Sequence, residues 1–305
     1  MSNDDPFTLD LFNTTTQSPG LGLGVTAFGG DFGTAASDVE HTSSPASPAA
    51  ASVAQPVQSR PGAGRVRQGG DNFYLAGDRG LAKGWKQRAR DNLEAIRLAA
   101  EIEAEDRPVT AEEQARLIRF TGFGASELAN AVFRRPGEEA FRAGWHEIGA
   151  ALEDAVSGQD YASLARCTQY AHFTPEFIVR AIWAGLQRLG WRGGRLLEPG
   201  IGTGLFPALM PSELRDKVYV TGVELDPVTA RIARLLQPRA RILNSDFARA
   251  DLPASFDLAI GNPPFSDRTV RSDHAYRGMG LRLHDYFIVR SIDLLNALHP
   301  WRLHA

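Results

Sequence analysis

The stretch Phe256–Phe265, with the sequence FDLAIGNPPF, constrains the fold of this 305-residue chain more than any other. Its first half, Phe256–Ile260, is a short apolar run of the kind that is typical of a buried strand. Its second half cannot continue a strand, because Pro263 and Pro264 remove two consecutive backbone donors and fix φ. The sequence therefore predicts a rigid loop at the end of a strand, where open α/β sheets bind their ligands.

The loop Asn262-Pro263-Pro264-Phe265 carries one amide and one aromatic ring, which suits a flat base with an exocyclic amino group. The lone pair of adenine N6 is delocalised into the ring, so this amine is a poor nucleophile. The Asn262 side-chain oxygen and the Pro263 carbonyl oxygen would accept both N6 hydrogens, and the prolines would fix these acceptors in advance. Phe265 would stack on a base flipped out of a duplex. On the tetrapeptide alone, a proline-rich turn with a core phenylalanine explains the residues equally well.

Composition sets limits on the class of protein. The 33 basic side chains nearly balance the 36 acidic ones, so any contact with nucleic acid has to be local. The single cysteine, Cys167, excludes an internal disulfide and fits a reducing cytoplasm. No apolar run reaches transmembrane length, and the acidic start is unlike a signal peptide, so we expect a soluble, cytoplasmic protein. The histidines and the cysteine lack metal-ligand spacing, so no metal is expected.

Residues 1–75 are rich in Ser, Thr, Ala, Gly, Pro and Gln. Such a composition buries too little apolar surface to offset chain entropy, so this stretch is predicted to be a disordered tail. Order is expected to begin near Leu81, in a helical subdomain over residues 81–160. Its expected helices cover Trp85–Glu105, a segment opened by the capping-box pattern Thr110–Glu113, Ser126–Phe133 and about 138–156. The run Arg119–Gly124 is interpreted as core, with a nucleic-acid surface as the alternative.

Residues 165–305 alternate between short apolar runs and amphipathic segments, which predicts an α/β domain with a parallel, doubly wound sheet. The expected strands are 195–197, 218–223, 241–243 and 256–260. Ahead of them, Thr174 is a good N-cap and Pro175 a good first residue for a helix. The apolar face expected for this helix consists of Phe177, Ile178, Ala181, Ile182, Leu186 and Leu189.

Polar or glycine-rich groups follow each expected strand. The first strand leads into Glu198 and the turn Gly200–Gly204, the second ends at Glu224, and the third is followed by Asp246. A dinucleotide-binding fold also has a glycine-rich turn with an acid about 20 residues later. Two features argue against that fold. The spacing is Gly-x-Gly-x-Gly after Glu-Pro, and a dehydrogenase has no use for the Asn262–Phe265 loop.

Together, these segments resemble the class I, S-adenosylmethionine-dependent methyltransferases that act on adenine N6 in DNA. Their catalytic signature is Asn, Asp or Ser, then Pro-Pro, then Phe, Tyr or Trp. The resemblance covers roughly residues 165–298, with the cofactor region before the catalytic loop. It implies S-adenosylmethionine as cofactor, DNA as substrate, and direct methyl transfer to a flipped base without a metal. It also implies a Rossmann-like sheet, here incomplete with about four parallel strands.

The resemblance also implies roles for individual residues. The methionine end of the cofactor would be bordered by Phe173, Thr174 and Pro175. The amino and carboxylate groups of the cofactor would be held by Glu198, Pro199, Gly200, Gly202 and Gly204. Glu224 would accept hydrogen bonds from both ribose hydroxyls, and the adenine ring would be bound by Asp246 and Phe247. The target base would be taken by Asn262, Pro263, Pro264 and Phe265.

A narrower similarity links the chain to the amino-terminal part of large proteins of plasmids, phages and conjugative elements. These mobile-element proteins join a methylase to a helicase and are sometimes linked to restriction-modification or antirestriction. The matching segments are Glu113–Gly124, Ala171–Thr174, Ser266–Arg271 and Leu283–Phe287. Further strands and a helicase module would follow there, whereas this sequence ends at Ala305. We therefore expect a C-terminally truncated methyltransferase domain.

Two other functions remain open at this point. One is methylation of an RNA base or of a protein glutamine amide, for which similar loops are used. The other is an inactive remnant that binds nucleic acid or cofactor.

Three arginines in the stretch after the catalytic loop are candidates for DNA contacts. Arg268, Arg271 and Arg277 are predicted to bind phosphates beside the flipped base. The alternative is that the arginines of this stretch pair with its own carboxylates, Asp267, Asp273 and Asp285.

Overall fold

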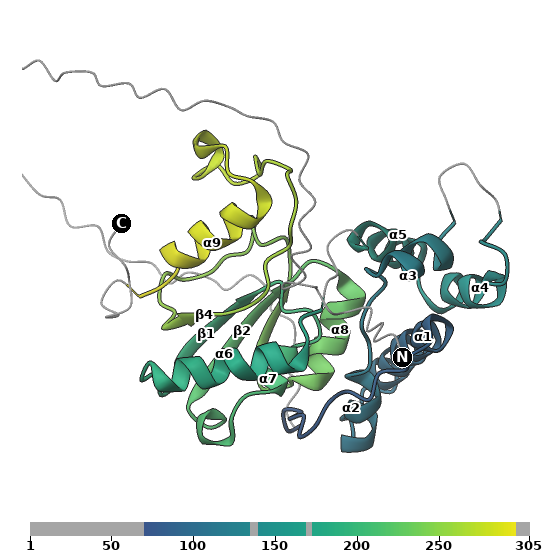
Figure 1. Ribbon diagram of the computed structural model, residues 1–305, viewed down its shortest axis with the longest axis horizontal. Helices are drawn as coiled ribbons and strands as arrows, with labels where there is room; N and C mark the ends of the chain where they lie inside the picture. The colour runs from purple at the N-terminus through teal and green to yellow at the C-terminus, as the bar shows by residue number, and fades with distance from the viewer. Residues whose placement is uncertain (1–69, 135–139, 169–172, 297–305) are drawn as a thin grey trace, which may run out of the picture. The chain divides into compact units, whose positions relative to one another are not determined.

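A computed structural model describes residues 70–134, 140–168 and 173–296 (Figure 1). Most of the predicted tail, residues 169–172 and residues 297–305 therefore lie outside the described part. Four parallel strands form the sheet: β1 (Gly194–Pro199), β2 (Val218–Glu224), β3 (Arg241–Asn244) and β4 (Leu258–Ala259). Their spatial order is β3-β2-β1-β4, the arrangement of the first half of a doubly wound sheet. The predicted fold class is confirmed.

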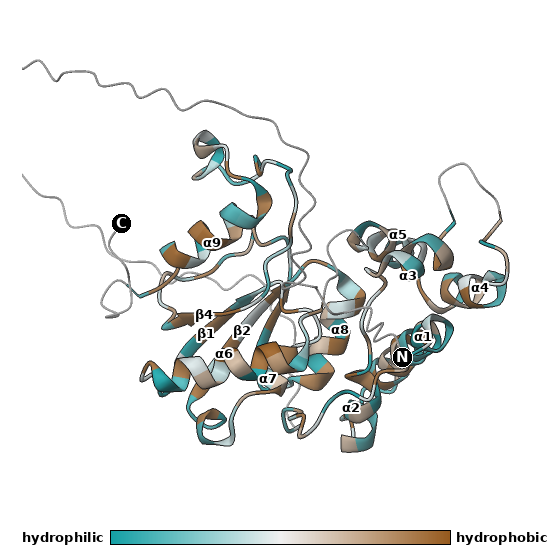
Figure 2. Cartoon of the chain, in the orientation of Figure 1, coloured by the Kyte–Doolittle hydropathy of each residue, from teal (hydrophilic) through white to brown (hydrophobic). Residues whose placement is uncertain are grey.

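The register of the sheet brings the carboxyl ends of its strands together. Pro199 pairs with Val223, and Glu224 pairs with Asn244. Alternate residues of each strand enter different cores, because successive side chains point to opposite faces. Leu196 and Val220 join one buried cluster, whereas Leu197 and Val223 join another. Figure 2 shows hydrophobic residues along much of the strands, as expected for a sheet covered on both sides.

Helices cover both faces of this sheet. One face carries α6 (Glu176–Arg188), α7 (Leu205–Ala208) and α8 (Pro227–Leu236), and the other carries α9 (Leu283–Asp293) (Figure 1). Two short 3-10 turns, η1 (Ser212–Leu214) and η2 (Arg277–Met279), lie in connecting segments. No helix in the described ranges is long and apolar enough to cross a membrane.

The helical segment comprises α1 (Trp85–Ala104), α2 (Ala111–Leu117), α3 (Ser126–Val132), α4 (His146–Ala155) and α5 (Gly158–Cys167). The predicted capping box is present, because Thr110 and Glu113 exchange both hydrogen bonds. The helix predicted over 138–156 is wrong in extent, since α4 begins only at His146. A separate helix, α5, follows and was not predicted. The chain turns extended at Val156, and the Ser157 side chain then caps α5 by accepting a bond from the Asp160 amide.

Residues 70–80 lie ahead of the predicted start of order at Leu81, yet they are bound to the sheet domain. The Phe73 amide donates to the Leu236 carbonyl oxygen and the Leu75 amide to that of Ala208, each at 2.7 Å. The guanidinium of Arg180 donates to the Gly77 carbonyl oxygen at 2.6 Å. This strap, residues 70–80, therefore connects to α6, α7 and α8.

The predicted start of α6 is wrong by one residue, and its predicted apolar face is wrong except at Leu186, which packs against a buried cluster. Pro175 is the N-cap, and Thr174 precedes it. Phe177 and Leu189 are 68% and 61% exposed, whereas Val179 and Trp183 are buried. The helix carries two apolar stripes. The stripe with Trp183 packs inward because its indole both donates to the Phe206 carbonyl oxygen (2.9 Å) and packs on another buried indole.

Helix α9 begins at Leu283 and ends at Asp293. After it, the chain runs beside the beginning of β4. The Phe256 amide donates to the Leu294 carbonyl oxygen (3.1 Å), and the Asn296 amide donates to that of Phe256 (2.7 Å). Leu295 and Phe256 therefore form an isolated parallel bridge.

Candidate functional site

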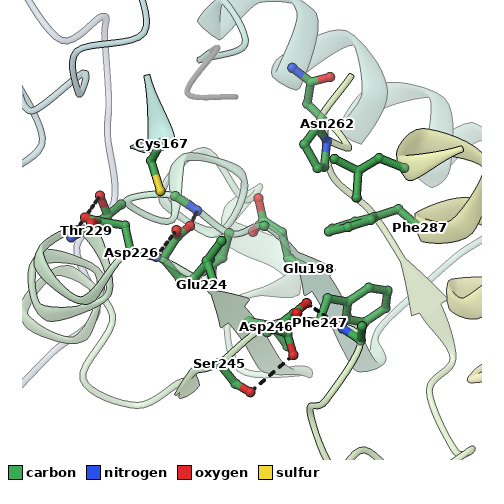
Figure 3. Close-up of a pocket in the computed structure, with 18 of the residues that line it drawn as sticks. Cys167, Glu198, Glu224, Asp226, Thr229, Ser245, Asp246, Phe247, Asn262 and Phe287 are labelled. Carbon is green, nitrogen blue, oxygen red and sulfur yellow. Dashed lines mark hydrogen bonds between the residues drawn. The ribbon is translucent and has the colours of Figure 1, made fainter. Parts of the chain in front are cut away.

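A cavity of about 550 Å³ lies at the carboxyl ends of the strands (Figure 3). Every strand end contributes a polar side chain to its lining, among them Glu198 from β1, Glu224 from β2, Asp246 after β3 and Asn262 after β4. Other predicted site residues also line it: Phe173, Thr174, Gly200, Gly202, Phe247, Pro264, Arg268 and Arg271. The remaining predicted residues are not part of the lining: Pro175, Pro199, Gly204, Pro263, Phe265 and Arg277.

Glu198 is a buried carboxyl group that lacks full hydrogen bonding. Only 2% of the residue is exposed, and its Oε2 atom has no hydrogen-bond partner among the described residues. Burial, followed by the negative charge of Glu224, raises the pKa of Glu198 well above its usual value. Burial therefore favours the protonated form of this carboxyl group, and a cation in the cavity would favour its ionised form. This arrangement fits a positively charged ligand group.

Glu224 connects the end of β2 to the glycine-rich turn. Its carboxylate accepts bonds from the Gly202 and Asp226 amides, both at 2.9 Å. Burial raises its pKa to about 7, although these backbone bonds oppose the shift. Gly202 has a φ of +58°, and a Cβ there would meet the Phe173 ring at 3.4 Å. Glycine therefore lets the turn approach both Glu224 and Phe173.

Asp246 and Phe247 form the floor of the cavity after β3. The Asp246 Oδ1 atom accepts a bond from the Ala248 amide (2.9 Å), which fixes the turn. The Phe247 ring is 3% exposed and packs against Phe287, with ring centroids 4.8 Å apart. It is therefore both a core residue and a wall of the cavity.

The residues of the predicted catalytic loop do not all face the cavity. Asn262 and Pro264 line the cavity, whereas Phe265 is 62% exposed and has its ring 6.2 Å from that of His284. The alternative of a core phenylalanine is therefore wrong. An exposed ring beside the cavity remains available to a partner from solvent.

The stretch after this loop pairs two of its carboxylates with arginines other than those predicted to bind DNA. Asp267 contacts Arg282 at 3.0 Å, and Asp273 contacts Arg290 at 3.3 Å. Asp285 lies 3.4 Å from the His284 ring. The three candidate arginines form no ion pair within the described residues. Arg277 instead donates to the Arg271 carbonyl oxygen at 3.2 Å.

Several residues that line the cavity were not predicted. Phe287 comes from α9, Leu164 and Cys167 come from α5, and Phe123 comes from the turn after α2. Interpreting Arg119–Gly124 as core was correct, since Phe120 and Phe123 are 0% and 2% exposed. No sequence signal marked α5 as a cavity wall. Within the described ranges, no three His, Cys, Asp or Glu side chains are grouped to hold a metal ion.

No family model matches the chain. It is 32% identical over 130 residues to defense against restriction protein B of Escherichia phage P1, covering 40% of this chain and 5% of that protein. It is 37% identical over 107 residues to type II methyltransferase M.CvrRI of Paramecium bursaria Chlorella virus XZ-6E, covering 33% and 26%. It is 30% identical over 113 residues to a tRNA1(Val) (adenine(37)-N6)-methyltransferase of Porphyromonas gingivalis, covering 33% and 44%. The chain thus spans less than half the length of these curated relatives.

Solved structures were also matched. A putative class I S-adenosylmethionine-dependent methyltransferase from Listeria monocytogenes is 14% identical, with 69% of this chain and 71% of that chain covered and a TM-score of 0.38. The methyltransferase subunit of a type I restriction-modification system from Streptococcus thermophilus is 16% identical, with 67% and 53% covered and a TM-score of 0.34. These TM-scores are too low to carry an argument. The sheet order β3-β2-β1-β4 shows a Rossmann-like fold, and in sequence part of the chain is similar to proteins named as methyltransferases.

Proposed function

We propose that this chain methylates adenine N6 in DNA, with S-adenosylmethionine as the methyl donor. One observation carries the proposal. The Asn262–Phe265 loop comes shortly after β4 and borders the same cavity as the acids at the ends of β1 and β2 and after β3. A site that holds a cationic nucleoside cofactor next to an amine-binding loop needs both halves at one sheet edge.

The cavity fits the charge of the cofactor. The unpartnered carboxyl of Glu198 suits its ammonium group, because a buried carboxylate needs a positive partner. Glu224 would accept bonds from the ribose hydroxyls, and Asp246 with Phe247 would bind the adenine ring. The cofactor supplies a methyl group on a positively charged sulfur. The resemblance to the N6-adenine methyltransferases implies each of these roles.

The chain's own contribution is to orient the target amine. The Asn262 side-chain oxygen and the Pro263 carbonyl oxygen would accept the two N6 hydrogens, which directs the nitrogen lone pair away from the ring. The two prolines hold these acceptors in place before the base arrives, so little reorganisation is needed. The exposed Phe265 ring would stack on the flipped base. The released proton leaves to solvent after transfer.

DNA is the first candidate substrate because two relatives carry names from restriction biology. A tRNA adenine is the second candidate, since other relatives are named tRNA1(Val) (adenine(37)-N6)-methyltransferases. A link to antirestriction or to a helicase module belongs to the same proposal.

A labelling experiment tests the function. The protein is incubated with methyl-labelled S-adenosylmethionine and duplex DNA, single-stranded DNA or tRNA, and the nucleosides are analysed by mass spectrometry. We expect labelled N6-methyladenine from DNA. The Asn262→Ala variant should lose transfer while calorimetry shows nearly unchanged cofactor binding. Label in tRNA alone selects the second substrate, label in protein selects a glutamine methyltransferase, and cofactor binding without any transfer contradicts an active enzyme.

A further inference from the structure

One wall of the cavity comes from the helical segment rather than from the sheet. Gly122 and Phe123 follow α2, and Leu164 and Cys167 lie on α5. Figure 3 shows Cys167 on the side of Glu224 and Asp226, with Asn262 on the opposite side of the cavity. The helical segment thus faces the groups proposed to hold the nucleoside part of the cofactor.

Helix α5 is fixed to the end of β2 by a buried hydrogen bond. The Ser163 hydroxyl donates to Asp226 Oδ1 at 2.7 Å, and these residues are 4% and 2% exposed. The other Asp226 oxygen caps α8 by accepting from the Thr229 amide and hydroxyl, both at 2.8 Å. Because the Asp226 amide also donates to Glu224, α5 is connected to the residue that positions this carboxylate.

The turn at Gly122 and Phe123 is fixed by a second buried polar residue. Asn92 of α1 is 0% exposed and binds the turn through both ends of its amide. It accepts from the Thr121 amide at 2.8 Å and donates to the Gly122 carbonyl oxygen at 2.6 Å. The Phe123 ring packs edge-on against that of Phe133, at 5.4 Å. This side of the cavity is therefore a formed surface.

The chemistry of this wall suits a nucleoside better than an amino acid. Burial raises the pKa of the Cys167 thiol to about 12, and the charges of Asp226 and Glu224 add to the shift. The thiol therefore stays neutral and behaves as a small polarisable apolar group rather than a nucleophile. With Leu164 and Phe123 it lines the same cavity as Glu224, the carboxylate proposed to bind the ribose hydroxyls.

We propose that α5 and the Gly122–Phe123 turn form the nucleoside-facing wall of the cofactor site. Leu164 and Cys167 contact the nucleoside, and Ser163 is a positioning residue that acts through Asp226. This inference rests on the proposed function, because it takes S-adenosylmethionine as the ligand. It makes the helical segment part of the cofactor site.

The chain has a single cysteine, so the rate of thiol modification measures how accessible the cavity wall at Cys167 is. Its modification by methyl methanethiosulfonate is followed by intact mass, and ligand occupancy is measured by calorimetry. With S-adenosylhomocysteine at about 100 times its Kd, modification should slow about 100-fold, since only free protein reacts. At equal occupancy 5′-methylthioadenosine, which lacks the amino-acid end, should protect as well. Methionine should not protect.

Substitutions test the wall from the protein side. Cys167→Trp should weaken the binding of both nucleosides about tenfold or more by filling the space, whereas Cys167→Ala should change it by less than about threefold. Ser163→Ala should weaken binding about tenfold through loss of the bond to Asp226. Arg166→Ala, on the exposed side of α5, is the matched control and should bind normally. Thermal unfolding identifies any variant that fails to fold.

Two results separate the proposals. If S-adenosylhomocysteine binds and the rate of Cys167 modification is unchanged, the wall proposal is wrong and the proposed function stands. If neither S-adenosylhomocysteine nor S-adenosylmethionine binds to the folded protein, the proposed function fails and the wall proposal fails with it.

Discussion

Glu198 and Glu224 are buried carboxyl groups whose raised pKa links ligand binding to stability. Folding raises the pKa of both, to about 7 for Glu224. Between the unfolded value, near 4.5, and the folded value, the folded chain binds more protons than the unfolded chain. At low pH these two groups therefore do not lower the unfolding free energy of the ligand-free protein. As the pH rises through this window, the unfolding free energy falls. A cationic ligand removes the penalty.

A comparison of variants isolates this effect from the other carboxylates. Between pH 5 and 8 the raised pKa of Glu224 alone should cost the wild-type protein roughly 2 kcal/mol of unfolding free energy, and Glu198 should add to this loss. The isosteric, neutral Glu198→Gln variant should lose less over the same range, as measured by urea unfolding at each pH. Parallel pH profiles for the two proteins would show that Glu198 is not a strained carboxyl.

Glu224 carries the second prediction at this scale. Glu224→Ala removes an acceptor proposed for the ribose hydroxyls and releases the Gly202 amide that it now holds. We expect S-adenosylmethionine binding to weaken by roughly 2 kcal/mol, the value of a charge-assisted hydrogen bond. Calorimetry measures the loss, and unchanged affinity in a folded variant would remove Glu224 from the site.

At the scale of elements, α9 holds two functional segments through one side chain. The Arg290 guanidinium donates to the carbonyl oxygens of Phe247 and Ala250, the latter at 2.7 Å. It also lies 2.9 Å from the Tyr286 hydroxyl, which in turn donates to Asp273 at 2.7 Å. The segment after β3 and the stretch after the catalytic loop are thus bound to the same helix.

Removing this guanidinium should lower the unfolding free energy more than removing an exposed one. Arg290→Met is expected to lower the unfolding free energy by about 3 kcal/mol, because it leaves a half-buried Asp273 without its cation. Arg282→Met breaks only an exposed pair with Asp267 and should cost less than about 1 kcal/mol. Urea unfolding measures both, and equal losses would contradict an anchoring role for Arg290.

Local patterns predicted most of the elements. The Thr110 capping box and the four strands followed from residues that are neighbours in sequence. The acids at the strand ends also met in one cavity, because parallel strands end at a common edge. Three features depend on distant partners and were missed. The strap at 70–80 is bound by α7 and α8, and the inward stripe of α6 is fixed by the contacts of Trp183. Helix α5 is held beside the cavity by a hydrogen bond from Ser163 to Asp226.

On the scale of the whole molecule, the net charge is −3, yet the stretch after the catalytic loop has a local excess of cations. Arg268, Arg271 and Arg277 are exposed, and the nearby aspartates already have other partners. Replacing all three with Ala should flatten the dependence of log K for duplex DNA on log salt by about 2–3 units, because each phosphate contact releases counterions. Arg116→Ala, on the distant helix α2, is the control. An unaltered slope in the triple variant contradicts phosphate contacts.

The shared core of α1, α2 and α8 also bears on how the chain is made. Leu98 and Ile102 of α1 belong to the same buried cluster as Val228, Ile232 and Leu236 of α8. During synthesis α1 leaves the ribosome first, and about 130 further residues must follow before α8 is complete, which takes on the order of 10 s. Until then the apolar stripe of α1 lacks these partners, so a chaperone has a defined interval in which to bind it.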